Sequence, residues 1–368
     1  MGNKKWNRRQ FLIRVKDIGL GAAGLALMTA CGVKPTPELV RVATQAPGPS
    51  PTEPPATATL APTEVISPTS SPTATAVPTQ PSSATATPAR ASTATATPAP
   101  AYLAVARGPD PAEITRRAIA ALGGIERFLK PGANVIIKPN ICNAYHGMEF
   151  ASTTNPTVVG TLVALCVAAG AKSVRVMDYP FGGTPQASYA KSGIADAVKA
   201  AGGEMVVMSQ VKFRSIDIPK GRRIQKWTVY GDILDADLVI NVPIAKDHAA
   251  TRLTLGMKNL MGVIEDRAGF HSRGLHQCIA DLNTVVRPQL TVVDAVRILM
   301  DNGPTGGNLA DVKKMDTVIA STDVVAADAY AATLFDLKPA DIGYIRLGDE
   351  MGIGKMDLKS IRIEEITV

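Results

Sequence analysis

The stretch Asp235–Val263, DADLVINVPIAKDHAATRLTLGMKNLMGV, decides the fold of this chain. Its first part contains a nearly unbroken apolar run, Leu238–Val242, which is typical of a buried strand in a parallel sheet. Polar side chains, including Lys246 and His248, follow after Pro243. Ligands of open α/β sheets bind outside the carboxyl ends of the strands. We therefore expect a functional site directly after this strand.

Strand and helix patterns alternate on both sides of this run, and this alternation predicts an α/β fold with a mostly parallel sheet and helices on both faces. Apolar strand patterns occupy residues 133–140, 173–180, 204–210, 289–296 and 316–322, and helical spacing occupies 111–129, 155–170, 186–203, 279–288 and 323–337.

Residues 211–230 break the alternation, because apolar residues recur at every second position around a Pro-Lys-Gly turn. This pattern predicts a β-hairpin inserted in the α/β body. Its six basic side chains are interpreted as a solvated face, with a contact to an anionic ligand or envelope polymer as the alternative.

The first hundred residues have a different composition. Arg8 and Arg9 precede a weakly apolar segment that is too short to span a bilayer and that ends in LMTAC at Cys31. This order predicts a twin-arginine signal peptide with a lipobox over residues 1–31 and a lipid on Cys31. A generic basic leader with an ordinary thiol is the alternative.

Several expectations about cellular context follow from this signal. The partners are the twin-arginine translocase and the lipoprotein-processing enzymes, and lipidated Cys31 anchors the chain to the extracytoplasmic face of a prokaryotic cell membrane. Residues 32–101, rich in Pro, Thr, Ser and Ala, are predicted to be a disordered linker. Residues 102–368 are predicted to form the α/β domain.

The net charge of +7 comes mostly from the signal peptide, since residues 1–30 hold six basic and one acidic side chain. Residues 31–101 hold three of each, so about +2 remains for the predicted domain. This balance argues against nucleic acid as a partner.

The cysteines and the export route bear on the cofactor. The domain contains Cys142, Cys166 and Cys278 without a C-x-x-C pair, which argues against an iron-sulfur cluster on this chain. The twin-arginine route carries folded proteins, so a metal ion or a cofactor inserted before export is expected, although its identity is unknown. Cys142, in a polar loop, is the one thiol of interest for a site.

Polar residues follow two further predicted strands. Lys138 and Asn140 end the strand at 133–140, and Asp178 ends the next. Thr153 and Thr154 open the helix at 155–170, where free backbone N–H groups could bind an anion or where the side chains simply cap the helix.

The segment after Pro243 supplies the remaining candidates. In a single helix, Thr251, Thr254 and Lys258 would share one face, so two hydroxyls and an ammonium group would point into one cavity. The predicted catalytic residues are Lys258, His248 and Lys138; the predicted substrate-binding residues are Asn140, Thr153, Thr154, Lys246, Thr254 and Asn259; the predicted metal ligands are His248, His271 and Asp178.

The ordered motifs VIIKPN, STTNP, VRVMD, AKDHAATRLTLGMKNLMGV, FHSRGLHQCIADL, LTVVDAV, NGPTGG and ASTDVVAADA resemble domain of unknown function 362, over about Val135–Gly354. The spacing K-x-H followed by T-x-x-x-K-N-x-x-G is the most specific part of this resemblance. Members often carry ferredoxin-type cysteine modules, which this chain lacks. The interval from His248 to Lys258, with a further histidine at 271 or 276, is also similar to the site of nickel-pincer lactate racemases, in which histidines and a lysine hold a nickel-carrying nucleotide.

These residues favour an enzyme that depends on a metal or cofactor and acts on an anionic small molecule, by isomerase-type or redox-type chemistry. A membrane-tethered lipoprotein that binds an anionic solute or envelope polymer without changing it is the alternative. The sequence leaves the substrate and the reaction open.

Overall fold

The structure, a computed structural model, describes residues 101–368. The predicted signal peptide, with Arg8, Arg9 and Cys31, lies outside the described residues, as does the predicted linker except for its last residue. Within residues 101–368 no helix combines the length and the apolar character needed to cross a membrane.

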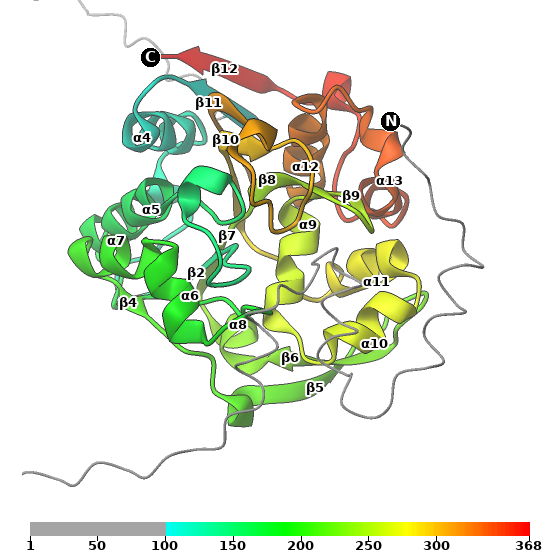
Figure 1. The fold of residues 1–368 in the computed structure, drawn as a ribbon. Coiled ribbons are helices and arrows are strands. Elements are labelled where there is room, and N and C mark those ends of the chain that lie inside the picture. Colours follow the sequence, from blue (N-terminus) through cyan, green and yellow to red (C-terminus); the bar gives the residue numbers. More distant parts are fainter. Residues whose placement is uncertain (1–100) are drawn as a thin grey trace, which may run out of the picture. The chain divides into compact units, whose positions relative to one another are not determined.

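A ten-stranded sheet runs through the described body (Figure 1). Eight strands follow the order β12-β1-β11-β10-β7-β2-β3-β4. Outside this order, β8 pairs with β10, and β9 pairs with β8. The strands are β1 (Leu103–Arg107), β2 (Asn134–Pro139), β3 (Ser173–Val176), β4 (Glu204–Met205), β7 (Leu238–Val242), β8 (Ile244–His248), β9 (Arg252–Thr254), β10 (Leu290–Leu299), β11 (Val312–Ser321) and β12 (Ile363–Thr367).

The central strand pairs are parallel, as predicted. β7 runs parallel to β2 and β10, and the parallel series continues from β2 through β3 to β4. The exceptions are β11, which is antiparallel to β1 and β10, and β9, which is antiparallel to β8. The sequence analysis missed β1 and β12, which pair with each other at the edge of the sheet.

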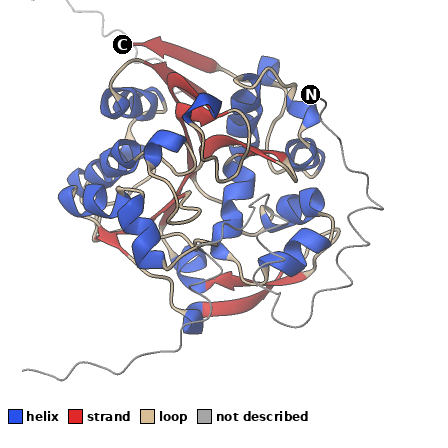
Figure 2. Ribbon diagram, viewed as in Figure 1, coloured by secondary structure: helices blue, strands red, loops and turns tan. Residues whose placement is uncertain are grey.

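Helices cover both faces of the sheet, which confirms the predicted fold class (Figure 2). One apolar core contains residues of α4 (Pro111–Ala121), α5 (Pro156–Ala168) and α7 (Ile194–Ala200), and α6 (Pro185–Lys191) lies next to α7. The opposite core contains residues of α8 (Gly231–Asp235), α9 (Gly256–Asn259), α10 (Arg267–Ser272), α11 (Leu275–Leu282), α12 (Val324–Thr333) and α13 (Gly343–Glu350). The predicted helix at 186–203 is divided between α6 and α7 at Gly193, whose φ of 73° interrupts a right-handed helix.

The deciding stretch forms three strands, β7, β8 and β9, instead of one. All five residues of β7 are buried, and after Pro243 the chain continues as β8, which pairs with β10. Because side chains alternate along a strand, Lys246 and His248 of β8 share one face. The polar residues after Pro243 are therefore held by a sheet and not by a loop.

The predicted helix face with Thr251, Thr254 and Lys258 is wrong. Thr254 belongs to β9 and lies opposite Lys246 of β8, whereas Lys258 belongs to the four-residue helix α9. The pairing of β8 with β9 stabilises an extended backbone at 252–254, which overrides the local helical pattern.

The hairpin predicted near 211–230 is confirmed as β5 (Phe213–Asp217) and β6 (Lys226–Tyr230). Acidic side chains of the same chain pair with four of its basic residues: Lys212 with Asp232, Arg214 with Asp235, Arg222 with Glu350, and Lys226 with Asp217. Ion pairs of this kind are expected for the solvated basic face that was predicted for this hairpin. The hairpin also contacts the segment before α10, since the Trp227 Nε1 donates to the Glu265 carbonyl.

Candidate functional site

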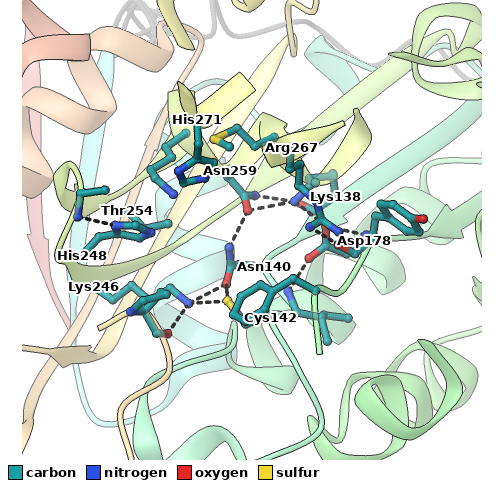
Figure 3. A pocket seen from close by; sticks show the side chains of 18 of the residues that line it. Lys138, Asn140, Cys142, Asp178, Lys246, His248, Thr254, Asn259, Arg267 and His271 are labelled. Atoms are coloured by element: carbon teal, nitrogen blue, oxygen red, sulfur yellow. Dashed lines mark hydrogen bonds and ion pairs between the residues drawn. The ribbon is translucent and has the colours of Figure 1, made fainter. Parts of the chain in front are cut away.

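A cavity of about 550 Å³ lies where the chain leaves β2, β3 and β8 (Figure 3). It is lined by Lys138, Asn140, Ile141, Cys142, Asp178, Tyr179, Phe181, Lys246, His248, Ala250, Thr254, Lys258, Asn259, Met261, Gly262, Arg267, Ala268, His271, Ser272 and Pro304. Most of the predicted site residues converge here although they lie up to 133 positions apart in the chain. The carboxyl ends of the parallel strands supply the site, as expected for an α/β fold.

The wall of this cavity is rich in positive charge. Lys138, Lys246, Lys258 and Arg267 line it, and Asp178 is the one carboxylate among the lining residues. Asp178 is itself ion-paired with Lys138, with 2.8 Å between Nζ and Oδ1. The cavity therefore presents a positive field to whatever binds in it.

Lys138 is held by the protein at the base of the cavity. Its Nζ donates to the Pro139 carbonyl and to Asn259 Oδ1, both at 2.9 Å, in addition to the ion pair with Asp178. Burial lowers the pKa of Lys138, and the carboxylate of Asp178 opposes this shift. Because its three N–H groups are all used within the protein, Lys138 is placed to position its neighbours, and its predicted catalytic role stays a prediction.

Gly262 permits the close approach of this ion pair. A Cβ at position 262 would lie 2.0 Å from Asp178 Oδ1 and 2.4 Å from Lys138 Nζ. Any side chain at this position would displace the pair, so glycine is required by the contact.

Lys246 is fully buried, and within residues 101–368 its ammonium group has no carboxylate partner. Its Nζ donates to Asn140 Oδ1 at 3.0 Å, Cys142 Sγ at 2.8 Å and the carbonyls of Ser152 at 2.6 Å and Pro304 at 3.0 Å. Three of these acceptors are amide or backbone oxygens, which satisfy hydrogen bonds without cancelling the charge of the ammonium group. An anion in the cavity would offset the cost of this buried ammonium group.

Asn140 and Asn259 connect the two lysines. Asn140 Oδ1 accepts from Lys246, its Nδ2 donates to Asn259 Oδ1 at 2.9 Å, and the same Asn259 oxygen accepts from Lys138. Asn259 Nδ2 donates to Asn241 Oδ1 at 2.8 Å. The two amides predicted to bind substrate thus form a continuous hydrogen-bonded base under the cavity.

His248 lines the cavity as a neutral imidazole. Burial, followed by the charges of Lys258 and Lys246, holds the pKa of His248 far below its usual range. Its Nδ1 accepts from the Ala250 N–H at 3.0 Å, so the ring proton is assigned to Nε2. His248 can therefore donate a hydrogen bond to a ligand.

His271, on α10, is the second neutral histidine of the wall. Burial, followed by the charges of Lys258 and Arg267, lowers its pKa to about 4. The ring centroids of His271 and His248 are 6.5 Å apart. His276 does not line the cavity, since it stacks on Tyr344 and its Nδ1 accepts from the Tyr344 N–H.

Thr254 adds a hydroxyl to the wall near Lys246. The residue is 3% exposed, and its Oγ1 has no hydrogen-bond partner within residues 101–368. Buried hydroxyls are normally bonded, so this unpaired oxygen beside the cavity is a candidate for a contact with a ligand.

Thr153 and Thr154 do not line the cavity, unlike the other predicted substrate-binding residues. The Thr153 hydroxyl donates to the Asn140 carbonyl, and the Thr154 hydroxyl donates to the Val242 carbonyl. These threonines hold the loop after β2 against β7. The helix cap that was expected from them is supplied by Asn155, whose side chain accepts from the Thr157 N–H.

Two buried aspartates accept hydrogen bonds from backbone N–H groups at the starts of two helices near the site. The Asn155 N–H at the start of α5 donates to Asp294 Oδ2 at 2.7 Å. Asp328 of α12 accepts from the N–H groups of Gly256 at 2.6 Å and Met257 at 2.8 Å, at the start of α9. Burial raises the pKa of Asp294 to about 6 and that of Asp328 to about 8.

The predicted metal ligands do not form one group. Asp178 is taken by Lys138, and within residues 101–368 no three His, Cys, Asp or Glu side chains are grouped so that they could hold a metal ion. His248 and His271 alone would supply two nitrogen donors, fewer than the three protein ligands typical of catalytic zinc sites. We therefore derive no step of the chemistry through a metal.

Comparison with known proteins places these residues in a family. A family model described as Domain of unknown function (DUF362) matches residues 135–333, more than half of the chain. The chain belongs to this family. The resemblance noted from the motifs is thereby confirmed, and the matched DUF362 region includes every residue that lines the cavity.

The individual proteins that resemble this chain have low sequence identity to it. A thylakoid-associated protein of Synechocystis sp. is 27% identical over 253 residues, which are 65% of this chain and 74% of that protein. The lactate racemase apoprotein from Thermoanaerobacterium thermosaccharolyticum aligns with a TM-score of 0.40 and 14% identity, over 62% of this chain and 56% of that chain. A Thermotoga maritima protein solved by a structural genomics consortium aligns with a TM-score of 0.38 and 11% identity, over 62% and 60% of the two chains. This chain spans less than two thirds of either solved protein, and at these TM-scores neither alignment supports an inference about function.

The sequence analysis missed Arg267 as a residue of the site. Its guanidinium group donates to the carbonyls of Tyr179 and Pro180 and lies 4.8 Å from the centroid of the Tyr179 ring. Arg267 and His271 are four residues apart on α10, and this spacing could have placed them on one face. Nothing in the local sequence indicated that Pro304, from the loop after β10, also lines the cavity.

Proposed function

We propose that this DUF362 protein is an enzyme that acts on an organic anion bound in the cavity. The charge of the wall is the observation that supports this most: four basic side chains line it, and its one carboxylate is already paired with Lys138. A volume of about 550 Å³ suits an organic molecule better than an inorganic ion.

The chemistry that the side chains support is proton transfer. Neutral His271 can accept a proton from the substrate, while His248 can donate a hydrogen bond through Nε2 to a substrate oxygen. The ammonium group of Lys258, a buried residue, would stabilise negative charge that develops there. Proton removal and return are the steps of an isomerase-type reaction, which we favour over redox chemistry because it needs only these groups.

Hydrogen exchange in D₂O tests this proposal. We expect the protein to replace a carbon-bound hydrogen with deuterium in one or more organic acids of a panel of 2-oxo, 2-hydroxy and 2-amino acids, followed by proton NMR. His271→Gln should slow exchange at least 100-fold, in line with the loss of a general base. The matched control is His276→Gln, which changes a histidine outside the cavity and should leave exchange unchanged.

A binding protein without catalytic activity is the second candidate. The observation that favours it is the internal bonding of Lys138 and Lys246, which makes the base of the cavity rigid and already satisfied. This function predicts that an organic acid raises the melting temperature of the protein, while no acid in the panel exchanges hydrogen. In that case His271→Gln would weaken binding without removing any activity.

We further propose that the DUF362 body acts outside the cytoplasm, tethered to the membrane. The support is in the sequence: the order of Arg8, Arg9 and the lipobox ending at Cys31. A cofactor inserted before export stays compatible with this route, and its identity is left to mass spectrometry of the purified full-length chain.

A further inference from the structure

One end of the cavity has positive charge and no carboxylate among its lining residues. Thr254 lies opposite Lys246 in the β8–β9 pair, and His248 lies one alternation along β8 from Lys246. Figure 3 shows Lys246, His248 and Thr254 together, while Asp178 lies at the other end beside Lys138 and Arg267. We call this end, formed by Lys246, His248, Thr254 and Lys258, the cationic end.

The cationic end offers unused hydrogen-bond donors on side chains. Within residues 101–368 the Oγ1 of Thr254 has no partner although the residue is 3% exposed, and the Nε2 of His248 carries the ring proton because Nδ1 accepts from Ala250. The Thr254 hydroxyl and the His248 N–H are therefore two neutral donors close to the ammonium groups of Lys246 and Lys258. Such a set matches a carboxylate, which has two acceptor oxygens and a single negative charge.

The structural features that would favour a phosphate are already occupied. Phosphates commonly bind to the free N–H groups at a helix start. Here the N–H of Asn155 at the start of α5 is bound by Asp294, and the N–H groups of Gly256 and Met257 at the start of α9 are bound by Asp328. Arg267 is directed to the carbonyls of Tyr179 and Pro180. A phosphate would therefore find neither a helix start nor an arginine fork at the cationic end.

Apolar side chains line the rest of the cavity. Ile141, Phe181 and Met261 contribute to the wall, and the volume exceeds what a two-carbon acid would fill. An organic anion with an apolar body would bury that surface from water, which stabilises the complex in proportion to the area buried.

We propose that the ligand is a monocarboxylate with an aromatic or branched apolar body, whose carboxylate binds at the cationic end through Thr254 and His248. This inference rests on the proposed function and narrows its substrate class. The apolar body then lies against Phe181 and Met261.

Calorimetric titration of the full-length chain with phenylacetate, acetate and phenyl phosphate tests this assignment. We expect phenylacetate to bind at least tenfold more tightly than either of the other two. Thr254→Val, which keeps the shape of the side chain, should weaken phenylacetate about tenfold or more because a hydrogen bond to a charged group is lost. Thr254→Ser should restore the affinity, and Thr157→Val, an exposed change in α5, should have no effect.

The outcomes separate this inference from the proposed function. If phenyl phosphate binds as tightly as phenylacetate, or if Thr254→Val binds phenylacetate normally, the carboxylate assignment is wrong. The proposed function survives either result provided that Lys258→Ala abolishes the binding, because an organic anion would still occupy the cavity. If none of the three probes binds to the folded protein, the carboxylate assignment fails, and the proposed function is then decided by the hydrogen-exchange panel alone.

Discussion

Gly262 shows how a single missing side chain shapes the site. Gly262→Ala would drive a Cβ into the ion pair of Lys138 and Asp178. We expect a loss of about 1–3 kcal/mol in the free energy of unfolding, as for other overpacked interiors, together with weaker anion binding. Urea denaturation measures the first effect and calorimetry the second.

Gly160→Ala is the control for this prediction. In α5 the nearest contact of an added Cβ would be the Ala197 carbonyl at 3.3 Å, and alanine favours the helix. The change should therefore cost less than about 1 kcal/mol. Equal losses for the two variants would contradict the explanation given for Gly262.

His271 should make stability depend on pH. Its pKa of about 4 lies below the ordinary value of 6.5, so between these values the unfolded chain binds more protons than the folded one. The stability contribution is complete above pH 6.5 and is lost as pH falls toward 4. The slope approaches about 1 kcal/mol per pH unit, reduced because the ring is partly solvated.

The measurement is the free energy of unfolding of wild type and of His271→Gln at several pH values. The difference between the two proteins isolates the contribution of His271, because Asp294 and Asp328 titrate in both. Those carboxyls have raised pKa values and oppose the slope, because their protonated forms are favoured in the fold. A difference in unfolding free energy that does not change between pH 7 and pH 5 would show that His271 titrates normally.

The helix α9 is too short to be stable by itself. Its four residues carry Lys258 and Asn259 into the cavity, and isolated helices of this length do not persist in water. Asp328 of α12 fixes its first turn through two backbone hydrogen bonds. The position of Lys258 therefore depends on a residue 70 positions later in the chain.

Asp328→Ala tests this dependence. Two buried N–H groups would lose their acceptor, so we expect a loss of about 2 kcal/mol or more in unfolding free energy. Amide hydrogen exchange should accelerate at residues 256–259 more than in α5. Unchanged protection of α9 with an unchanged affinity for anions would exclude a positioning role for Asp328.

At the scale of the whole molecule, the predicted twin-arginine signal can be tested by its effect on where the protein is found. Replacing Arg8 and Arg9 together with lysine should keep the folded protein inside the cell, and Cys31→Ser should release exported protein from the membrane. Cell fractionation with a protease-accessibility assay distinguishes the two results. Export of the double-lysine variant at the normal rate would contradict the twin-arginine assignment.

The sequence predicted those parts of the fold and site that depend on local patterns. The parallel strands, and the places of Lys138 and His248 at the strand ends, followed from apolar runs with polar residues at their ends, whereas Lys258 was predicted from a helical spacing that the structure contradicts. The pairing of β1 with β11 and β12 joins residues more than 200 positions apart, which no local pattern encodes. The error at Thr254 has a different origin, because the pair of β8 with β9 joins residues at most eight positions apart and overrode a competing helical spacing.

The contact of the hairpin with α10 has a practical consequence. Trp227 is the one tryptophan in residues 101–368; its ring packs edge-on against Phe270, with 5.4 Å between the ring centroids. Phe270 precedes His271, so a ligand that shifts α10 changes the surroundings of this indole. Excited near 295 nm, a variant with Trp6 replaced by phenylalanine would emit fluorescence from Trp227 alone. Occupancy of the cavity could then be followed optically before any substrate is known.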